Sequence, residues 1–127
     1  MKDEIIVCNM TARTIVFLDE TGAEIGSIES SGKIRLSNNT EMVDMVRSDL
    51  GFDIPVTETR YGDAHMLPTK KDGSIFIVSI IIAQAYPDRD DFYVTNETVR
   101  DAHARIIGCK SIKRNPFFRG GQNESED

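Results

Sequence analysis

The side chains best suited to chemistry in this chain are arginines that lie beside polar loops. Arg89, Arg100 and Arg105 carry guanidinium groups, whose planar fork of N–H donors grips a phosphate through two hydrogen bonds at once. Residues 100–119 hold six basic side chains and one acidic side chain, although the whole chain has a net charge of −6. A basic segment on an acidic body favours binding of a small anion and disfavours binding of a long nucleic acid.

The turns supply further groups that suit a phosphate or a nucleobase. Amides, hydroxyls and backbone N–H groups in turns bind anions, and an aromatic ring offers a face on which a base stacks. The predicted ligand-binding residues are Asn9, Thr11, Arg13, Ser30, Ser31, Gly32, Tyr61, Gly62, Arg89, Phe92, Arg100 and Arg105. The alternative for each loop is ordinary turn chemistry, because Asn, Ser, Thr and Gly are the residues that turns use.

The sequence contains no motif of a familiar catalytic or metal centre. His65 and His103 are its only histidines, and it has no H-E-x-x-H, no cysteine–histidine metal spacing, no P-loop and no G-x-S-x-G elbow. We therefore assign no catalytic residue, no metal ligand and no cofactor. The acidic cluster of Asp88, Asp90 and Asp91 stays open between a Mg²⁺ site and a solvated loop.

Length and composition indicate one domain. A chain of 127 residues with 39% apolar side chains can form a core and falls within the usual domain size. We assign the domain to residues 1–119 and expect residues 120–127 to be a disordered acidic tail. Cys8 and Cys109 lie in apolar contexts, which favours two buried thiols, while a disulfide between them stays open. The longest apolar run, 75–83, is about half a membrane span, so we expect a cytoplasmic protein without membrane contact.

Most of the chain has the pattern of short strands separated by turns. β-branched and aromatic residues predict strands at 5–8, 14–18, 23–28, 34–36, 53–60, 74–79 and 92–94, and a last hairpin with arms at 99–100 and 105–109. The first two strands are expected to form a hairpin, and a turn at 19–22 leads into the third. Residues 80–86 fit either a strand or a helix.

One segment has helical rather than strand periodicity. Apolar side chains recur at i, i+3, i+4 and i+8 in Met42, Met45, Val46 and Leu50. With Asn38 as its N-cap and Gly51 closing its C-terminus, this stripe predicts a helix of about three turns. The fold class expected is α+β: a single β-rich domain with a mostly antiparallel sheet and one or two short helices. Because so small a domain has little depth for a closed pocket, we also expect a homo-oligomer.

Several short motifs occur in an order that is more specific than any one of them. They are Asn9 and Thr11, Ser31-Gly32, Tyr61-Gly62, Leu67-Pro68, Ile77-Val78-Ser79, Arg89-Asp90, Arg100-Asp101 and Arg105-Ile106-Ile107-Gly108-Cys109. Over residues 5–110 this pattern resembles a widespread family of small proteins encoded by bacteriophages, prophages and many bacteria. The chain departs from the family pattern at Met10, at Ala12-Arg13 in place of Pro-His, and at Ala104 in place of a turn glycine.

The resemblance implies a counter-defence role in the cytoplasm of the host cell. By analogy with other small phage proteins, the chain is expected to bind and sequester a cyclic nucleotide immune signal without cleaving it. Two alternatives stay open. One is an enzyme that hydrolyses a nucleotide or nucleotide-sugar, with Asp90, Asp91 or Asp101 as base or metal ligand. The other is a protein-binding inhibitor of a host enzyme, with residues 42–50 or Phe117-Phe118 as the contact.

Overall fold

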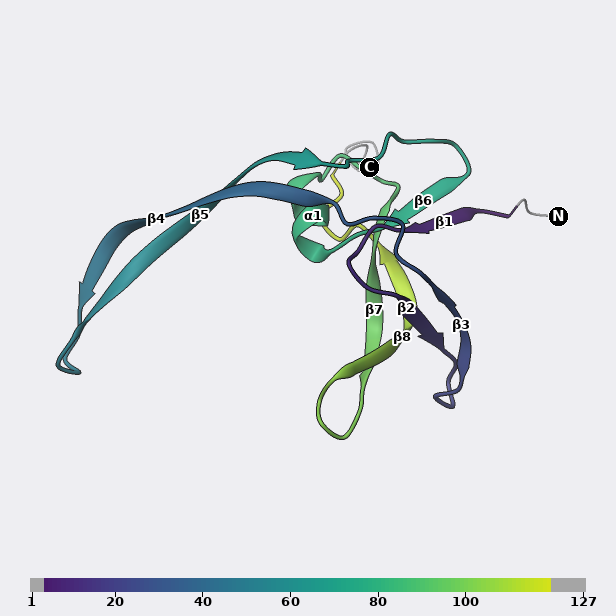
Figure 1. The fold of residues 1–127 in the computed structure, drawn as a ribbon, viewed down its shortest axis with the longest axis horizontal. Coiled ribbons are helices and arrows are strands. Elements are labelled where there is room, and N and C mark those ends of the chain that lie inside the picture. The colour runs from purple at the N-terminus through teal and green to yellow at the C-terminus, as the bar shows by residue number, and fades with distance from the viewer. Residues whose placement is uncertain (1–3, 120–127) are drawn as a thin grey trace, which may run out of the picture. The chain divides into compact units, whose positions relative to one another are not determined.

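The chain folds into two compact units, shown in the computed structural model of Figure 1, which describes residues 4–119. We call residues 4–34 and 66–119 the body, and residues 35–65 the ribbon. Strands hold 53% of the described residues and helix 5%, which confirms a β-rich fold with one short helix. The predicted tail at 120–127 lies outside the described residues.

The body is built on a six-stranded mixed sheet with the order β1-β6-β7-β8-β2-β3. Its strands are β1 (Ile6–Asn9), β2 (Ile15–Leu18), β3 (Glu24–Ile28), β6 (Ser74–Ile77), β7 (Phe92–Arg100) and β8 (Ile106–Arg114). The pairs β2–β3 and β7–β8 are antiparallel hairpins, as the sequence predicts. The pairs β1–β6, β6–β7 and β2–β8 are parallel.

The predicted opening hairpin is wrong, because the first two strands do not pair with each other. β1 pairs with β6, and the backbone N–H of Met10 extends this ladder by donating to the carbonyl of Ile77 at 2.8 Å. The reason is the strongly apolar sequence of β6, which is buried best between two neighbouring strands. After the bend that follows Asn9, the chain enters the opposite half of the same sheet, where β2 pairs with β8.

The ambiguous segment after β6 is a helix. Ser79 is the N-cap of α1 (Ile80–Ala85), and its hydroxyl accepts a hydrogen bond from the backbone N–H of Ile82 at 3.4 Å. The buried side chains of α1 are Ile82 and Ala83, and the helix packs against β7. Among the described residues, no helix has the length and apolar character needed to cross a membrane.

The core lies where β2, β6, β7 and β8 meet. Ile15, Ile77 and Cys109 form a buried cluster, and Phe92 is also fully buried. Cys109 and the half-buried Cys8 are both free thiols. Their strands, β8 and β1, are three places apart in the sheet, a separation of about 14 Å that excludes a disulfide.

The ribbon replaces the predicted helix at 38–50, which is wrong. Its two strands are β4 (Arg35–Arg47) and β5 (Asp53–His65), paired antiparallel over their length. A β-bulge between Met42 and Asp44 explains the misleading spacing. Met42 lies opposite Thr57 and Met45 lies opposite Pro55, so two methionines three residues apart share one face of a strand.

Candidate ligand-binding cleft

An open cleft of about 690 Å³ lies in the body, between the loop after β1, the start of α1, and strands β7 and β8. This volume falls within the range of about 300–1,000 Å³ that small-molecule sites occupy. Its described lining residues are Met10, Thr11, Ala12, Arg13, Thr14, Ile15, Val16, Lys33, Ile34, Val78, Ser79, Ile80, Val94, Thr95, Thr98, Ile106, Ile107, Gly108, Cys109 and Lys113. Apolar side chains and hydroxyls therefore dominate its surface.

The charged residues of the described lining are all cationic. They are Arg13, Lys33 and Lys113, each with an exposed side chain. The ion pairs found within residues 4–119 join other residues, so these three cations have no carboxylate partner there. On a chain of net charge −6, this cleft is a local site of positive charge.

Asn9 braces the loop that carries Arg13. The Asn9 side chain is fully buried, and its Nδ2 donates to the carbonyls of Arg13 at 2.7 Å and Ile28 at 2.9 Å. Its Oδ1 accepts from the backbone N–H of Thr11 at 2.9 Å and from the Thr11 hydroxyl at 2.6 Å. All these polar atoms are engaged inside the protein. Asn9 therefore shapes the cleft wall and does not itself present an amide to a ligand.

The structure brings the Ser30–Gly32 loop against the loop after β1. The Ser30 hydroxyl donates to the Thr11 carbonyl, and the Ser31 backbone N–H donates to the Asn9 carbonyl at 2.8 Å. Gly32 adopts a φ of +134°, which favours glycine. The next residue along is Lys33, so this loop positions a cation at the cleft.

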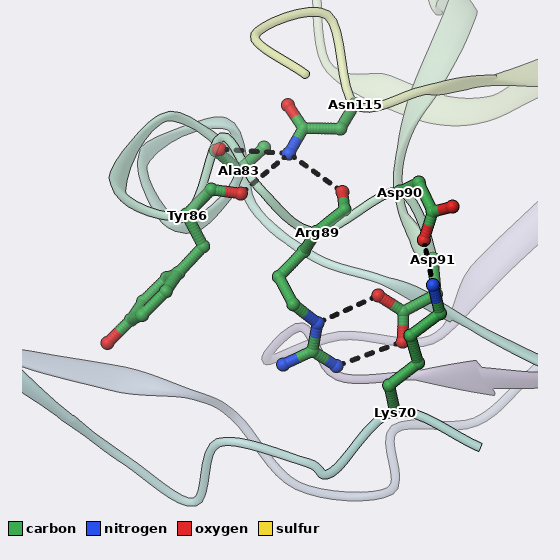
Figure 2. A network of polar contacts seen from close by, with 7 residues as sticks. All are labelled: Lys70, Ala83, Tyr86, Arg89, Asp90, Asp91 and Asn115. Atoms are coloured by element: carbon green, nitrogen blue, oxygen red, sulfur yellow. Dashed lines mark hydrogen bonds and ion pairs between the residues drawn. The ribbon is translucent and has the colours of Figure 1, made fainter. Parts of the chain in front are cut away.

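Arg89 and Phe92 lie outside the cleft lining, and Arg89 belongs to the network of polar contacts drawn in Figure 2. Arg89 forms a two-point ion pair with Asp91, with Nε–Oδ1 at 2.8 Å and Nη2–Oδ2 at 2.9 Å. Its guanidinium carbon lies 4.2 Å from the centre of the Phe92 ring. Because Phe92 is fully buried, it has no free face on which a base could stack, and the prediction of such a role is wrong.

Asn115 holds the loop that carries Arg89, as Figure 2 shows. Its Nδ2 donates to the carbonyls of Ala83 and Tyr86, each at 3.1 Å, and of Arg89 at 3.3 Å. Its Oδ1 accepts from the backbone N–H of Phe117 at 2.9 Å. One buried amide thus joins the end of α1 to the segment after β8.

Arg100 and Arg105 lie at the other end of β7 from Arg89. Arg100 donates to the carbonyl of Ala104 at 2.7 Å, and Arg105 pairs with Asp101 at 3.5 Å. Strand β7 runs from Phe92 to Arg100, a length of about 25 Å, so one copy of the chain does not bring the three arginines together. The predicted three-arginine clamp is therefore not present within a single chain.

Tyr61 and Gly62 belong to β5 of the ribbon. They are thus in a different unit from the other ten predicted ligand-binding residues. Of the twelve predicted residues, only Thr11 and Arg13 line the cleft.

The carboxylates considered as catalytic groups are engaged in structural contacts. Asp90 accepts a hydrogen bond from Lys70, which holds the pKa of that carboxyl below its usual value of 3.8, and Asp91 pairs with Arg89. Asp101 accepts from the backbone N–H groups of His103 at 2.8 Å and Arg105 at 3.0 Å. Within residues 4–119, no group of three or more His, Cys, Asp or Glu side chains is placed to hold a metal ion.

The sequence reasoning missed most of the cleft. Lys33 and Lys113 are residues that sequence motifs do not mark, and Thr95, Thr98 and Ile106 lie in strands where they look like ordinary sheet positions. A usable signal was present in β8. Lys110 and Lys113 are three residues apart in β8, so their side chains lie on opposite faces of the sheet. Only the packing of α1 and of the loop after β1 decides which face forms the cleft.

Comparisons with protein-family models, with curated proteins and with solved structures gave no significant match.

Proposed function

We propose that the chain binds a small anionic molecule in the body cleft and sequesters it without cleaving it, and that the ligand is a cyclic nucleotide immune signal. The observation that carries the proposal is the set of three unpaired cations, Arg13, Lys33 and Lys113, around an apolar cleft whose described lining has no acidic side chain. The resemblance to small phage and prophage proteins supports a counter-defence role for such binding.

The charges of the cleft suit a ligand with one or two phosphates. Each cation forms charge-assisted hydrogen bonds with phosphate oxygens, which are about twice as strong as neutral ones. The hydroxyls of Thr14, Thr95 and Thr98 suit the edges of a ribose or a base. The net charge of −6 disfavours long polyanions, so a short nucleotide fits better than a nucleic acid.

The apolar lining suits the base and sugar faces. Ile80, Ile106 and Ile107 offer aliphatic surface, whereas the described lining has no aromatic ring. Base recognition in this cleft would rely on van der Waals contact with isoleucines and on hydroxyl hydrogen bonds. The cleft is therefore expected to tolerate several bases more readily than changes in phosphate number.

Binding of cyclic di- and trinucleotides and cyclic ADP-ribose isomers tests the proposal, measured by native mass spectrometry and titration calorimetry. Wild-type protein should bind one member tightly, and Arg13→Glu and Lys113→Glu should each weaken it by about 10- to 100-fold, since a hydrogen bond to a charged group contributes about 1.5–3 kcal/mol. Lys110→Glu is the matched control, because Lys110 is an exposed lysine of β8 outside the cleft lining.

Two results would contradict the proposal. One is an equal loss of affinity in Lys110→Glu, which would assign the effect to net charge and not to the cleft. The other is the recovery of a cleaved nucleotide after heat denaturation of the complex, because a sequestering protein returns its ligand intact.

A second candidate, a protein-binding inhibitor, is favoured by one observation. Residues 42–50, which the sequence marked as a contact surface, expose Met42, Val43, Met45 and Val46 to solvent. Exposed apolar patches of this kind mark interaction sites. Co-purification of one host protein in fixed ratio, without any bound nucleotide, would favour this function over ligand sequestration.

A further inference from the structure

The cleft of the body presents positive charge that the described residues leave without a partner. Arg13, Lys33 and Lys113 line it with exposed side chains, and none of them joins an ion pair found within residues 4–119. By contrast, Lys70 of the same body already pairs with a carboxylate. Like charges that share a site repel one another, so an anion placed among the three cations is favoured. The cleft is therefore a place on the body where an additional carboxylate is stabilised.

The chain carries a compact set of carboxylates directly after the described residues. Residues 120–127 contain Glu124, Glu126 and Asp127 and no basic residue, so their side chains contribute a charge of −3. This charge is equal in size and opposite in sign to the charge of the three cleft cations. We call residues 122–127 the acidic segment. Its composition makes it complementary to the cleft.

The chain is long enough for the acidic segment to reach the cleft. Lys113 lines the cleft and lies six residues before Arg119, so the Cα atoms of the two residues are at most about 22 Å apart. Glu124 lies five residues beyond Arg119 and Asp127 lies eight, distances that extended chain spans over about 17 Å and about 26 Å. The two glycines at 120–121 permit a reversal of the chain, because glycine adopts positive φ readily. The carboxylates therefore lie within reach of Lys113.

Hydrogen bonds fix the point at which this part of the chain leaves the body. The backbone N–H of Asn115 donates to the carbonyl of Phe92 at 2.8 Å, and that of Arg119 donates to the carbonyl of Pro87 at 2.9 Å. A short tether from a fixed point gives the attached groups an effective concentration on the order of millimolar near their site. Exposed ion pairs are individually weak, but several pairs made by one tethered segment act together.

We propose that the acidic segment docks in the cleft of the body, where its carboxylates pair with Arg13, Lys33 and Lys113, and that this autoinhibitory contact must be displaced by an anionic ligand. The docking is argued from charge and chain length, whereas the competition with a ligand rests on the proposed function. A free anion with a single carboxylate competes poorly with three tethered ones, while a ligand with two phosphate groups brings several charge-assisted hydrogen bonds of its own. The acidic segment thus keeps singly charged anions out of the cleft.

Backbone amide chemical shifts of the full chain, measured by NMR in low salt, test the docking without any ligand. The variant to compare with the wild type combines Glu124→Gln, Glu126→Gln and Asp127→Asn, and we call it the amide variant. Amides of cleft residues such as Thr95 and Lys113 should shift between the two proteins, because the amide variant has no carboxylates to pair with the cations. In about 1 M salt the difference should disappear, since the Debye length falls to about 3 Å.

Two controls separate docking from a change in net charge. The first combines Glu20→Gln, Glu24→Gln and Asp72→Asn, which removes three exposed carboxylates of the body outside the cleft lining. It changes the net charge as the amide variant does, and should leave the cleft amides unshifted. The second repeats the comparison of wild-type and amide segments in a Lys113→Glu background, where the shift difference should vanish, and in a Lys110→Glu background, where it should persist.

Titration calorimetry with inorganic pyrophosphate tests the competition. The amide variant should bind pyrophosphate about 2- to 10-fold more tightly than the wild type in low salt, because no tethered competitor at millimolar effective concentration has to be displaced. Equal affinities would contradict the competition. Absence of binding to both proteins would contradict the proposed function, and the competition with it, while the chemical shifts still decide whether the segment docks.

Two outcomes would overturn the docking itself. The first is a set of cleft amides with the same chemical shifts in the wild type and the amide variant. The second is an equal shift of these amides in the control that removes carboxylates elsewhere on the body, which would assign the effect to net charge.

Discussion

The body and the ribbon both contain large apolar side chains, but the body buries many of them and the ribbon exposes them. In the body, Ile77, Phe92 and Cys109 are almost completely buried, and every buried side-chain polar atom of the described residues has a hydrogen-bond partner. In the ribbon, nearly every side chain is exposed, including eight large apolar ones. The body thus buries its apolar side chains and pairs its polar atoms internally, whereas the ribbon leaves most of its apolar side chains exposed.

Two buried asparagines stabilise the connections between the short strands of the body. Asn9 donates to two backbone carbonyls and Asn115 to three, and each accepts from one backbone N–H, so they replace strand pairing where the chain leaves the sheet. The loop that Asn9 holds carries Arg13 into the cleft. Within residues 35–65 the ribbon, by contrast, is held by its own ladder and by exposed side-chain contacts such as the Thr40–Thr59 hydroxyl pair at 2.7 Å.

Truncating a phenylalanine should give the largest difference between body and ribbon in the free energy of unfolding. Phe92→Ala should lower the free energy of unfolding by about 3–5 kcal/mol, because it leaves a cavity in the core beside Phe76 and Tyr86. Phe52→Ala, in the turn of the ribbon where Phe52 is 58% exposed, should change it by less than about 0.5 kcal/mol. Urea unfolding followed by circular dichroism measures both. Equal effects would remove the distinction between body and ribbon.

Charging an asparagine should have the next largest effect. Asn115→Asp replaces a donor to three carbonyls with an anion, and should cost about 2–4 kcal/mol of unfolding free energy. Asn39→Asp is the matched change in the ribbon, at an exposed position of β4, and should have little effect. Thermal unfolding of the two variants compares them. An Asn115→Asp variant that is as stable as the wild type would contradict the role of Asn115 in holding these loops.

Changing a carboxyl to an amide should have small effects of opposite sign. Asp90→Asn should destabilise the body, because the hydrogen bond from Lys70 lowers the pKa of Asp90 below 3.8 in the folded state. Glu58→Gln should stabilise the ribbon slightly, because it removes the repulsion from Glu41. Thermal unfolding reports the first change, and amide exchange of residues 35–65 reports the second.

The pH dependence gives this prediction a sign that can be checked. A depressed carboxyl pKa contributes stability above its usual value of 3.8, and this contribution is lost as the pH falls through the folded value. The difference between the wild type and Asp90→Asn should therefore be present at neutral pH and disappear in strong acid. High salt should reduce it as well, since the pair is partly exposed. A difference that grows on acidification would contradict the assignment.

The sequence predicted the positions of the body's strands, although not the pairing of β1, because burial there follows the strand period. The alternation and β-branching of 14–18, 74–79 and 92–94 reflect real contact with a core, so the strands lie where the pattern puts them. The ribbon failed for the opposite reason. The spacing of its apolar residues does not reflect burial in a core. One bulged residue near Val43 places residues of the same strand face three positions apart instead of two.

The site was harder to predict than the fold, because binding depends on contacts between distant segments. Arg89 looked available, yet Asp91, two residues away, occupies it. Arg13, which was predicted to bind a ligand, lines the cleft. Lys113 was not among the predicted residues, because no local pattern shows that its strand β8 meets the loop that carries Arg13. Residue type can suggest a phosphate ligand, but only topology decides which cations share a cleft.

Amide hydrogen exchange of the full chain tests the contrast between body and ribbon most directly. We predict that β6, β7 and β8 are strongly protected, because their strands border a buried core. Residues 35–65 should exchange much faster, because a two-stranded ribbon with exposed faces opens easily. Ribbon amides that are protected as strongly as those of the body would contradict the account.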